Sequence, residues 1–295
     1  MAVKSGYVSI VGRPNAGKST LMNAFLDFKL SAVSRKVQTT RNKIQGILTG
    51  KDHQIIFVDT PGVLEPKYEM QQYMKKEIKT SFKDTDLVLY LIDGANIVMK
   101  DLQKIEKDYK KDFDRQKRIV VLNKCDRLSE EQIFDKIATL KQELGVKDII
   151  TVSAVTKLNL DILKNVIIEN LPEGDFYYDN DTLTDKPEKF FVSEIIREKI
   201  LELYEEEIPY SVHVEVREFK VRDEDQKDYI NADIILERET QKIIVLGKRG
   251  EMIKKLGELA RIDIEAFVGK EVYLKLFVKV RKDWRKDHRF LKNIF

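Results

Sequence analysis

The chain has 295 residues, 42% hydrophobic and 35% charged; this length predicts about two domains, and this composition excludes a wholly disordered protein. Cys125 is the only cysteine and the three histidines are scattered, which excludes internal disulfides and argues against a Cys- or His-based metal site. The net charge of +3 is uneven, because residues 247–295 carry 14 basic and 7 acidic side chains, which indicates either a polyanion partner at that end or a solvated charged tail.

Short apolar runs alternate with amphipathic segments in residues 1–171, the predicted first domain. We expect strands at Tyr7–Val11, Ile44–Leu48, Gln54–Val58, Leu87–Ile92, Arg118–Leu122 and Asp148–Val152. We expect helices at Lys18–Leu26, Met70–Phe82, Asp101–Tyr109, Gln132–Leu144 and Leu160–Ile168. Strands rich in Val, Ile and Leu that alternate with helices are typical of a mostly parallel sheet covered on both faces. The sequence therefore predicts a doubly wound α/β fold.

The periodic pattern stops at residues 172–188, where Pro172, Gly174, Pro187 and several acids predict a linker. Residues 189–295 are expected to form a second, smaller α+β domain. Its expected elements are a helix at Phe190–Tyr204, strands at Ser211–Phe219 and Tyr229–Leu236, an apolar segment at Lys242–Leu246, a helix at Glu251–Phe267 and a strand at Val272–Val280. No apolar run is long enough to span a membrane and the first residues contain no signal segment, so a cytoplasmic location is expected.

A phosphate-binding loop follows the first predicted strand. It reads Gly12-Arg13-Pro14-Asn15-Ala16-Gly17-Lys18-Ser19, which matches the GxxxxGK[ST] motif of P-loop NTPases. Small residues let backbone N–H groups point at phosphates, and the N-terminus of the following helix favours an anion. We expect Lys18 to reach the β- and γ-phosphates and the Ser19 hydroxyl to bind Mg²⁺.

Two further segments are expected around the same phosphates. Asp59-Thr60-Pro61-Gly62 follows the third strand, with Asp59 in the Mg²⁺ shell and the Gly62 N–H near the γ-phosphate. In the earlier loop Gln38-Thr39-Thr40-Arg41, we expect Thr40 to close over Mg²⁺ when the γ-phosphate is present, with Thr39 as the adjacent alternative. Residue 63 is Val, whereas Ras-like enzymes use Gln there to orient water, so slow intrinsic hydrolysis is expected unless another group substitutes.

The base is predicted from Asn123-Lys124-Cys125-Asp126, directly after the fifth strand. The Asp126 carboxylate can accept from both N1–H and the exocyclic amine of guanine, whereas adenine offers no such donor pair. Lys124 is expected to pack over the ring, Asn123 to brace the neighbouring loops, and Ser153-Ala154 to supply a backbone N–H toward O6. These motifs predict binding of GTP and GDP.

The second half carries Gly247-Lys248-Arg249-Gly250 between two short helical segments. Such a GxxG loop can approach a single-stranded RNA backbone closely, and its basic tip residues meet phosphates. The order αββααβ around it is that of a type II KH domain, so we expect RNA binding through this loop and Lys254.

The C-terminal tail interleaves basic and aromatic residues. Lys282 and Arg285 could contact phosphates while Trp284 stacks on a base. In an alternative interpretation a terminal helix packs Trp284 and Phe290 onto the domain, or the basic end touches an anionic membrane.

The whole chain resembles the Era family of bacterial GTPases. The resemblance rests on GRPNAGKS, QTTR, DTPG, NKCD, VSA, GKRG and VYLKLFVKVRKDWR, and it covers nearly all 295 residues. It implies a GTP-hydrolysing switch that binds the 3′ region of 16S ribosomal RNA and assists late maturation of the 30S subunit. It also implies peripheral association with the inner membrane, and we expect a monomer.

Asn15 adds a hypothesis about hydrolysis. In related GTPases an Asn at this position, together with switch-loop carbonyls, holds K⁺ where an arginine finger would otherwise act. The alternative is that Asn15 only braces the loop.

The sequence leaves two other functions open for the whole protein. One is an RNA-binding chaperone in which GTP is mainly structural, and the other is a GTPase of tRNA modification or membrane traffic.

Overall fold

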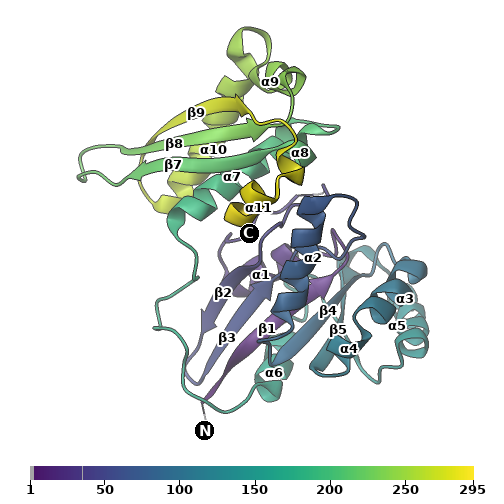
Figure 1. Ribbon diagram of the computed structural model, residues 1–295. Coiled ribbons are helices and arrows are strands. Elements are labelled where there is room, and N and C mark those ends of the chain that lie inside the picture. Colours follow the sequence, from purple (N-terminus) through teal and green to yellow (C-terminus); the bar gives the residue numbers. More distant parts are fainter. Residues whose placement is uncertain (1–2, 35) are drawn as a thin grey trace. The chain divides into compact units, whose positions relative to one another are not determined.

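The computed structural model describes residues 3–34 and 36–295, which form two compact units (Figure 1). The first unit contains Thr40–Pro66, Gln71–Asp185 and the described residues before Ala32. The second contains Lys186–Phe295 together with two short segments from the first half of the chain, Ala32–Thr39 and Lys67–Met70. Sequence patterns did not indicate that these two segments belong with the second unit.

The first unit is built on one twisted sheet in the order β2-β3-β1-β4-β5-β6. The strands are β1 Lys4–Gly12, β2 Ile44–Thr49, β3 His53–Asp59, β4 Leu87–Asp93, β5 Lys117–Asn123 and β6 Ile149–Thr151. Only β2 runs antiparallel to its neighbour β3, and the other pairs are parallel. The predicted mostly parallel α/β fold is confirmed, and all six expected strands are present.

Helices cover both faces of this sheet. They are α1 Lys18–Leu26, α2 Glu69–Ser81, α3 Met99–Asp108, α4 Lys110–Phe113, α5 Glu130–Leu144 and α6 Leu160–Asn170. On one face, Val88, Tyr90 and Ile92 of β4 pack in a cluster with buried residues of α2, α3 and α5. On the other face, Phe25 of α1 stacks on Phe57 of β3, with ring centroids 4.8 Å apart. This double burial is why the strands are continuously apolar.

Residues after 171, expected to be a linker, lie along the first unit until Asp185. Pro172 accepts a hydrogen bond from the Ser5 N–H at 3.2 Å, and Leu183 accepts one from the Ile47 N–H at 2.8 Å. The Tyr177 ring meets Tyr7 edge-on. This stretch therefore has defined partners although it lacks regular secondary structure.

The second unit packs helices on a three-stranded sheet of order β7-β8-β9. Its elements are α7 Glu188–Leu203, α8 Ile208–Ser211, β7 His213–Lys220, β8 Asp228–Leu236, α9 Glu239–Leu246, α10 Glu251–Val268, β9 Val272–Val280 and α11 His288–Ile294. β7 and β8 are antiparallel, whereas β8 and β9 are parallel. Ile196, Ile234 and Leu256 belong to one buried cluster that joins α7, the sheet and α10. The order α7-β7-β8-α9-α10-β9 is the αββααβ order expected for a type II KH domain.

Among the helices of residues 3–34 and 36–295, none combines the length and the apolar character that a membrane crossing requires.

Candidate functional site

The phosphate-binding loop connects β1 to α1 and needs glycine at two positions. A Cβ on Gly12 would lie 2.3 Å from the Leu91 carbonyl oxygen, and one on Gly17 would lie 2.3 Å from Nδ2 of Asn123. Gly17 also has a φ of 97°, and Asn15 has a φ of 63°. Side chains at the glycine positions would collide with fixed groups, so the loop backbone can stay close to its neighbours only with this sequence.

Lys18, the first residue of α1, lies buried beneath this loop. Its Nζ donates to the Arg13 carbonyl at 3.0 Å. Burial lowers the pKa of Lys18 to about 8, with a further lowering by Lys124 and an opposing contribution from Asp59. A bound phosphate would favour the charged form of this amine, because an opposite charge at short range offsets the cost of burial.

Ser19, Thr40 and Asp59 converge beside Lys18. The Ser19 hydroxyl donates to Oδ2 of Asp59 at 2.6 Å, and its oxygen lies 2.9 Å from Oγ1 of Thr40. Thr40 also donates to the same Asp59 oxygen at 3.4 Å. The sequence placed these three residues at Mg²⁺, and the structure brings them together from three elements of the first unit.

The chemistry of this group fits Mg²⁺. Oδ1 of Asp59 is buried and makes no hydrogen bond within the described part of the chain. Burial raises the pKa of Asp59, against the lowering effect of Lys18, so a cation would favour the charged carboxylate. Mg²⁺ is commonly held by one or two carboxylates plus substrate phosphates and waters, which agrees with one carboxylate and two hydroxyls here.

Gly62 and Val63 lie against the phosphate-binding loop. A Cβ on Gly62 would come within 2.7 Å of the Pro14 Cα, and the Val63 N–H donates to the Gly12 carbonyl at 3.0 Å. Val63 packs partly buried against the core of the first unit. Its side chain has no polar atom that could orient a water molecule.

The base-recognition segment is tied to the phosphate-binding loop by two side chains. Nδ2 of Asn123 donates to the Ala16 carbonyl at 2.9 Å, and its Oδ1 accepts from the Ala154 N–H at 3.0 Å. Nζ of Lys124 donates to the Asn15 carbonyl and to Oδ2 of Asp93, both at 2.6 Å. These contacts fix the segment that carries Asp126.

Asp126 lies in a short 3₁₀ turn, Cys125–Arg127, with about a quarter of its side chain exposed. Nε of Arg127 lies 4.0 Å from Oδ2 of Asp126. Ser153 is buried, and its hydroxyl accepts from the Thr156 N–H at 3.2 Å. The Ala154 N–H, expected to face guanine O6, donates to Asn123 in this structure, so its contact with the base stays a prediction.

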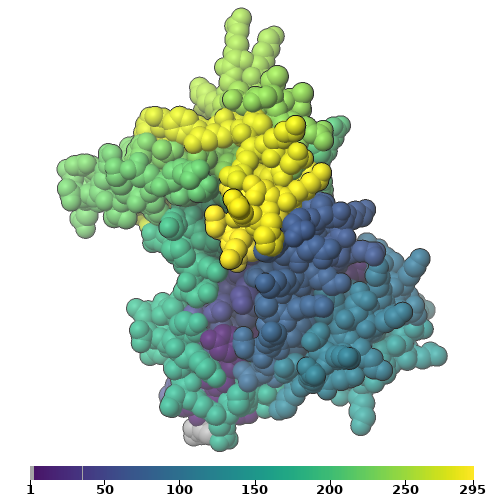
Figure 2. All heavy atoms as spheres, viewed as in Figure 1, coloured from purple at the N-terminus to yellow at the C-terminus, as the bar shows by residue number. Residues whose placement is uncertain are grey.

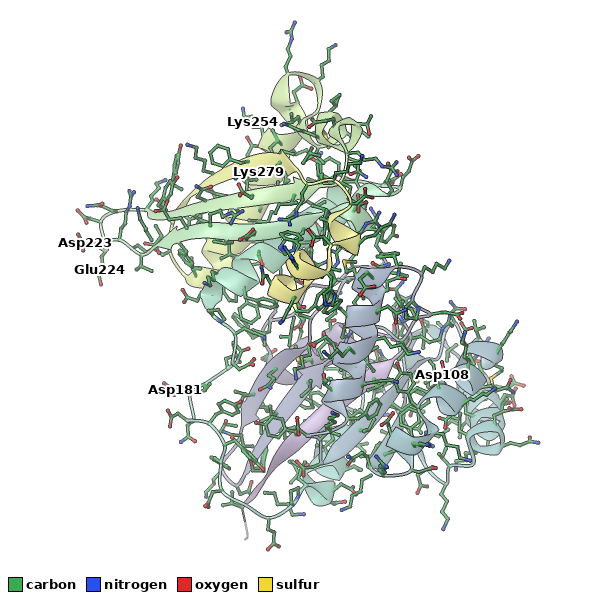
Figure 3. The ribbon with its side chains drawn as sticks, in the orientation of Figure 1. Asp108, Asp181, Asp223, Glu224, Lys254 and Lys279 are labelled. Carbon is green, nitrogen blue, oxygen red and sulfur yellow. The ribbon has the colours of Figure 1, made fainter. Side chains whose placement is uncertain are left out.

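The GKRG segment of the second unit forms an exposed turn between α9 and α10. Gly247, Arg249 and Gly250 have φ values of 71°, 53° and 81°. Lys248 and Arg249 are exposed at the tip, and Lys254 is exposed on the first turns of α10 (Figure 3). In Figure 2 the light-green part of the chain that contains this turn protrudes from the rest of its unit. The turn is accessible to a polyanion.

The C-terminal tail differs in the structure from the predicted set of RNA contacts. Trp284 was expected either to stack on a base or to pack onto the domain with Phe290. Its side chain is fully buried, Nε1 donates to the Ser211 carbonyl at 3.0 Å, and its ring meets Phe290 edge-on, which agrees with packing. The prediction of stacking is therefore wrong, because α11 packs the indole into the unit. Arg285 is paired with Glu237 and lies over the Tyr68 ring, so it is not a freely projecting phosphate ligand, whereas Lys282 is exposed.

Two charged side chains with clear structural roles were missed. Asp93, which holds Lys124, is the last residue of β4, and an acid at a strand end beside the site was a signal in the sequence. Arg197 is buried in α7. A charged residue next to the apolar Ile196 within an amphipathic helix was the only signal that could have found it.

The fold and the site define a GTPase of the P-loop class joined to a KH domain. A family model described as a 50S ribosome-binding GTPase matches residues 7–124, and a KH domain model matches residues 207–285. The GTPase Era of Caldanaerobacter subterraneus subsp. tengcongensis is 43% identical over 301 residues, covering 100% of this chain and 98% of the relative. The GTPase Era of Clostridium botulinum strain Eklund 17B is 42% identical over 292 residues, covering 99% and 98%.

Solved structures show the same similarity to Era as the sequences do. A variant of Aquifex aeolicus Era bound to GDP and AlF4⁻ has 36% identity and a TM-score of 0.94, and the match covers 98% of each chain. An Era structure in complex with MgGDPNP and nucleotides 1506–1542 of 16S ribosomal RNA has the same identity, TM-score and coverage. The chain belongs to the Era family of GTPases, and it hydrolyses GTP.

Proposed function

We propose that this protein couples its GTP cycle to binding of the 3′ region of 16S ribosomal RNA and thereby assists maturation of the 30S subunit. The observation that carries the proposal is the match over 98% of both chains to an Era structure that holds MgGDPNP and nucleotides 1506–1542 of that RNA. Coverage of both units supports transfer of the two activities together, since a match to the GTPase unit alone would not speak to RNA.

The RNA ligand is assigned to the GKRG turn. Lys248 and Arg249 are exposed at its tip, and the two flanking glycines leave no Cβ at the sides of the turn. A phosphodiester backbone can therefore come close to the peptide groups while the two cations neutralise its charge. Lys254 and Lys282 are proposed as additional phosphate contacts.

GTP is assigned to the loop of residues 12–19, with Lys18 on the β- and γ-phosphates, the Gly62 N–H near the γ-phosphate and Asp126 on guanine. Ser19, Thr40 and Asp59 would hold Mg²⁺, which when bound neutralises charge on the β- and γ-phosphates. Because the Val63 side chain has no polar atom, we further propose that Asn15 supports K⁺ binding during hydrolysis. Turnover that does not change when K⁺ is replaced by Na⁺ would remove this part of the proposal.

The proposal is tested by measuring binding to an RNA oligonucleotide of the 16S 3′ end, with GTP analogue, GDP or no nucleotide. Lys248→Ala combined with Arg249→Ala should weaken binding at least tenfold and reduce its salt dependence, since about two phosphate contacts are lost. The matched control is Lys220→Ala with Lys227→Ala, which removes two cations from the β7–β8 hairpin of the same unit and should have little effect.

The alternatives give different outcomes. If GTP is only structural, Lys18→Ala leaves RNA affinity and ribosome profiles unchanged. Crosslinking in cells followed by sequencing of the bound RNA distinguishes 16S ends from tRNA or from 50S RNA, the particle named in the family model's description. Crosslinked RNA that is not enriched in the 16S 3′ end would refute the proposal.

We also propose a cytoplasmic monomer whose basic tail makes peripheral contact with anionic lipid. Cosedimentation with vesicles containing phosphatidylglycerol, compared with neutral vesicles, tests the contact, and sedimentation velocity tests the monomer. The contact should weaken with added salt, because it depends on exposed lysines such as Lys282.

A further inference from the structure

Arg197 of α7 is a buried cation in the second unit, with only 1% of its surface exposed. Its guanidinium is paired with Glu194 one turn earlier, where Nε donates to Oε1 at 2.8 Å. The other side of the guanidinium meets backbone. Nη2 donates to the Thr39 carbonyl, and Nη1 donates to the Gln38 carbonyl at 3.5 Å. The helix thus binds peptide groups 158 and 159 residues earlier in the chain.

The same helix holds the rest of this segment. Glu198, 2% exposed, accepts the Val33 N–H on Oε1 at 2.8 Å. Nζ of Lys36 donates to the carbonyl of Tyr204, the C-cap of α7. Glu194, Arg197 and Glu198 have the i, i+3, i+4 spacing that places side chains on one face of a helix. That face and the C-cap hold Val33, Lys36, Gln38 and Thr39 within the second unit.

Burial makes these contacts strong. A buried guanidinium is tolerated only when its donors are satisfied, and removal of a partner leaves an unpaired charge or carbonyl in an apolar setting. A planar guanidinium can serve one carboxylate and two carbonyls at once, which the single ammonium of lysine cannot do with the same geometry. The backbone at Gln38 and Thr39 is therefore held in one conformation.

The next residue along the chain is Thr40, which belongs to the first unit. Its Oγ1 lies 2.9 Å from Oγ of Ser19 and donates to Asp59, so within the first unit the Thr40 hydroxyl faces the Mg²⁺–nucleotide site. One peptide bond separates a carbonyl anchored by α7 from a side chain directed at that site.

We propose that Arg197 is a positioning residue for GTP: it anchors the backbone of residues 38 and 39 and so presents Thr40 to the Mg²⁺–nucleotide complex. GDP lacks the γ-phosphate with which an ordered Thr40 segment is associated in GTPase switches, so the effect is selective for GTP. By thermodynamic linkage, GTP binding then stabilises the contacts of Gln38 and Thr39 with Arg197 by the same free energy.

The test compares Arg197→Ala and Arg197→Lys with the wild type by titration with a non-hydrolysable GTP analogue and with GDP in Mg²⁺. Arg197→Ala should raise the Kd for the analogue about tenfold or more, as expected for loss of hydrogen bonds to a charged donor, and change the GDP Kd less than twofold. Arg197→Lys keeps the ion pair with Glu194 and should show a smaller loss of the same selectivity. Lys189→Ala, at an exposed position of α7, is the matched control.

Two further readouts do not depend on turnover. Tryptic cleavage after Lys36 in nucleotide-free protein should be faster in Arg197→Ala, while the fluorescence of the buried Trp284 reports an intact second unit. In a Thr40→Ala background, Arg197→Ala should no longer weaken analogue binding, because the two residues act through one interaction. Equal losses for GTP and GDP, additive effects of the two substitutions, or unchanged cleavage would each overturn the proposal.

Discussion

Gly17→Ala is the substitution for which the structure gives the sharpest expectation. The new Cβ would lie 2.3 Å from Nδ2 of Asn123, and the residue would keep a φ of 97° that L-residues rarely adopt. Asn123 cannot move away without losing its bonds to the Ala16 carbonyl and the Ala154 N–H. A single methyl group should therefore disturb both the phosphate-binding loop and the base-recognition segment.

The magnitude follows from two contributions. A left-handed backbone conformation costs a non-glycine residue about 1–2 kcal/mol. Loss of two buried hydrogen bonds costs about 1 kcal/mol each, and more where a group is left unpaired. We therefore expect Gly17→Ala to lower the free energy of unfolding of the first unit by about 3–5 kcal/mol and to weaken GTP binding more than tenfold.

Gly145→Ala provides a matched control in the same unit. Gly145 ends α5 with a φ of 62°, but a Cβ there meets no atom within 4 Å, so only the backbone contribution of about 1–2 kcal/mol applies. Urea unfolding followed by far-UV circular dichroism measures both units, and the transition reported by Trp284 fluorescence identifies the part that belongs to the second unit, so that the remaining transition is that of the first. Equal destabilisation by the two substitutions, or unchanged GTP affinity in Gly17→Ala, would refute the reasoning.

Three other predictions concern single side chains. Lys18 has a pKa lowered to about 8 by burial, and phosphate binding favours its charged form, so nucleotide affinity should fall roughly fivefold between pH 8 and 9 and protons should be taken up on binding. Titration calorimetry in buffers of different ionisation enthalpy measures this uptake, and a pH-dependent affinity that persists in Lys18→Arg would contradict it. Asp126→Asn should lower GTP affinity by more than a hundredfold and favour xanthosine triphosphate, because a carboxylate that accepts two hydrogen bonds becomes an amide. Competition binding between the two nucleotides measures this change, and a variant that still prefers GTP would contradict the assignment of Asp126 to guanine. Trp284→Phe should lower the free energy of unfolding of the second unit by about 2 kcal/mol, because the hydrogen bond to the Ser211 carbonyl and part of the side-chain volume are lost. RNA affinity should stay unchanged below the melting temperature. A loss of RNA affinity without a loss of stability would favour base stacking by Trp284 instead.

Much of the fold and of the nucleotide site was predictable because the relevant information is local. Strands such as Leu87–Asp93 are short, apolar and bounded by turn residues, and the loop of residues 12–19 encodes its conformation in its own glycines. Since parallel strands place their C-terminal ends at one edge, motifs that follow successive strands must meet there. Convergence of Ser19 with Asp59 follows from this rule without any coordinates.

Other features depend on contacts between distant parts of the chain. From the sequence, Trp284 fits a base-stacking residue as well as a core residue, and only the contacts of its indole with the Ser211 carbonyl and with Phe290 of α11 show that it is buried. Arg197 looks like any charged residue of an amphipathic helix until the fold brings the Gln38 and Thr39 carbonyls to it. The hydrogen bonds of Trp284 with Ser211 and of Arg197 with Gln38 and Thr39 span 73, 159 and 158 residues, and composition and periodicity describe only near neighbours. The tertiary structure therefore decided which charges are buried and which segment before Thr40 they hold.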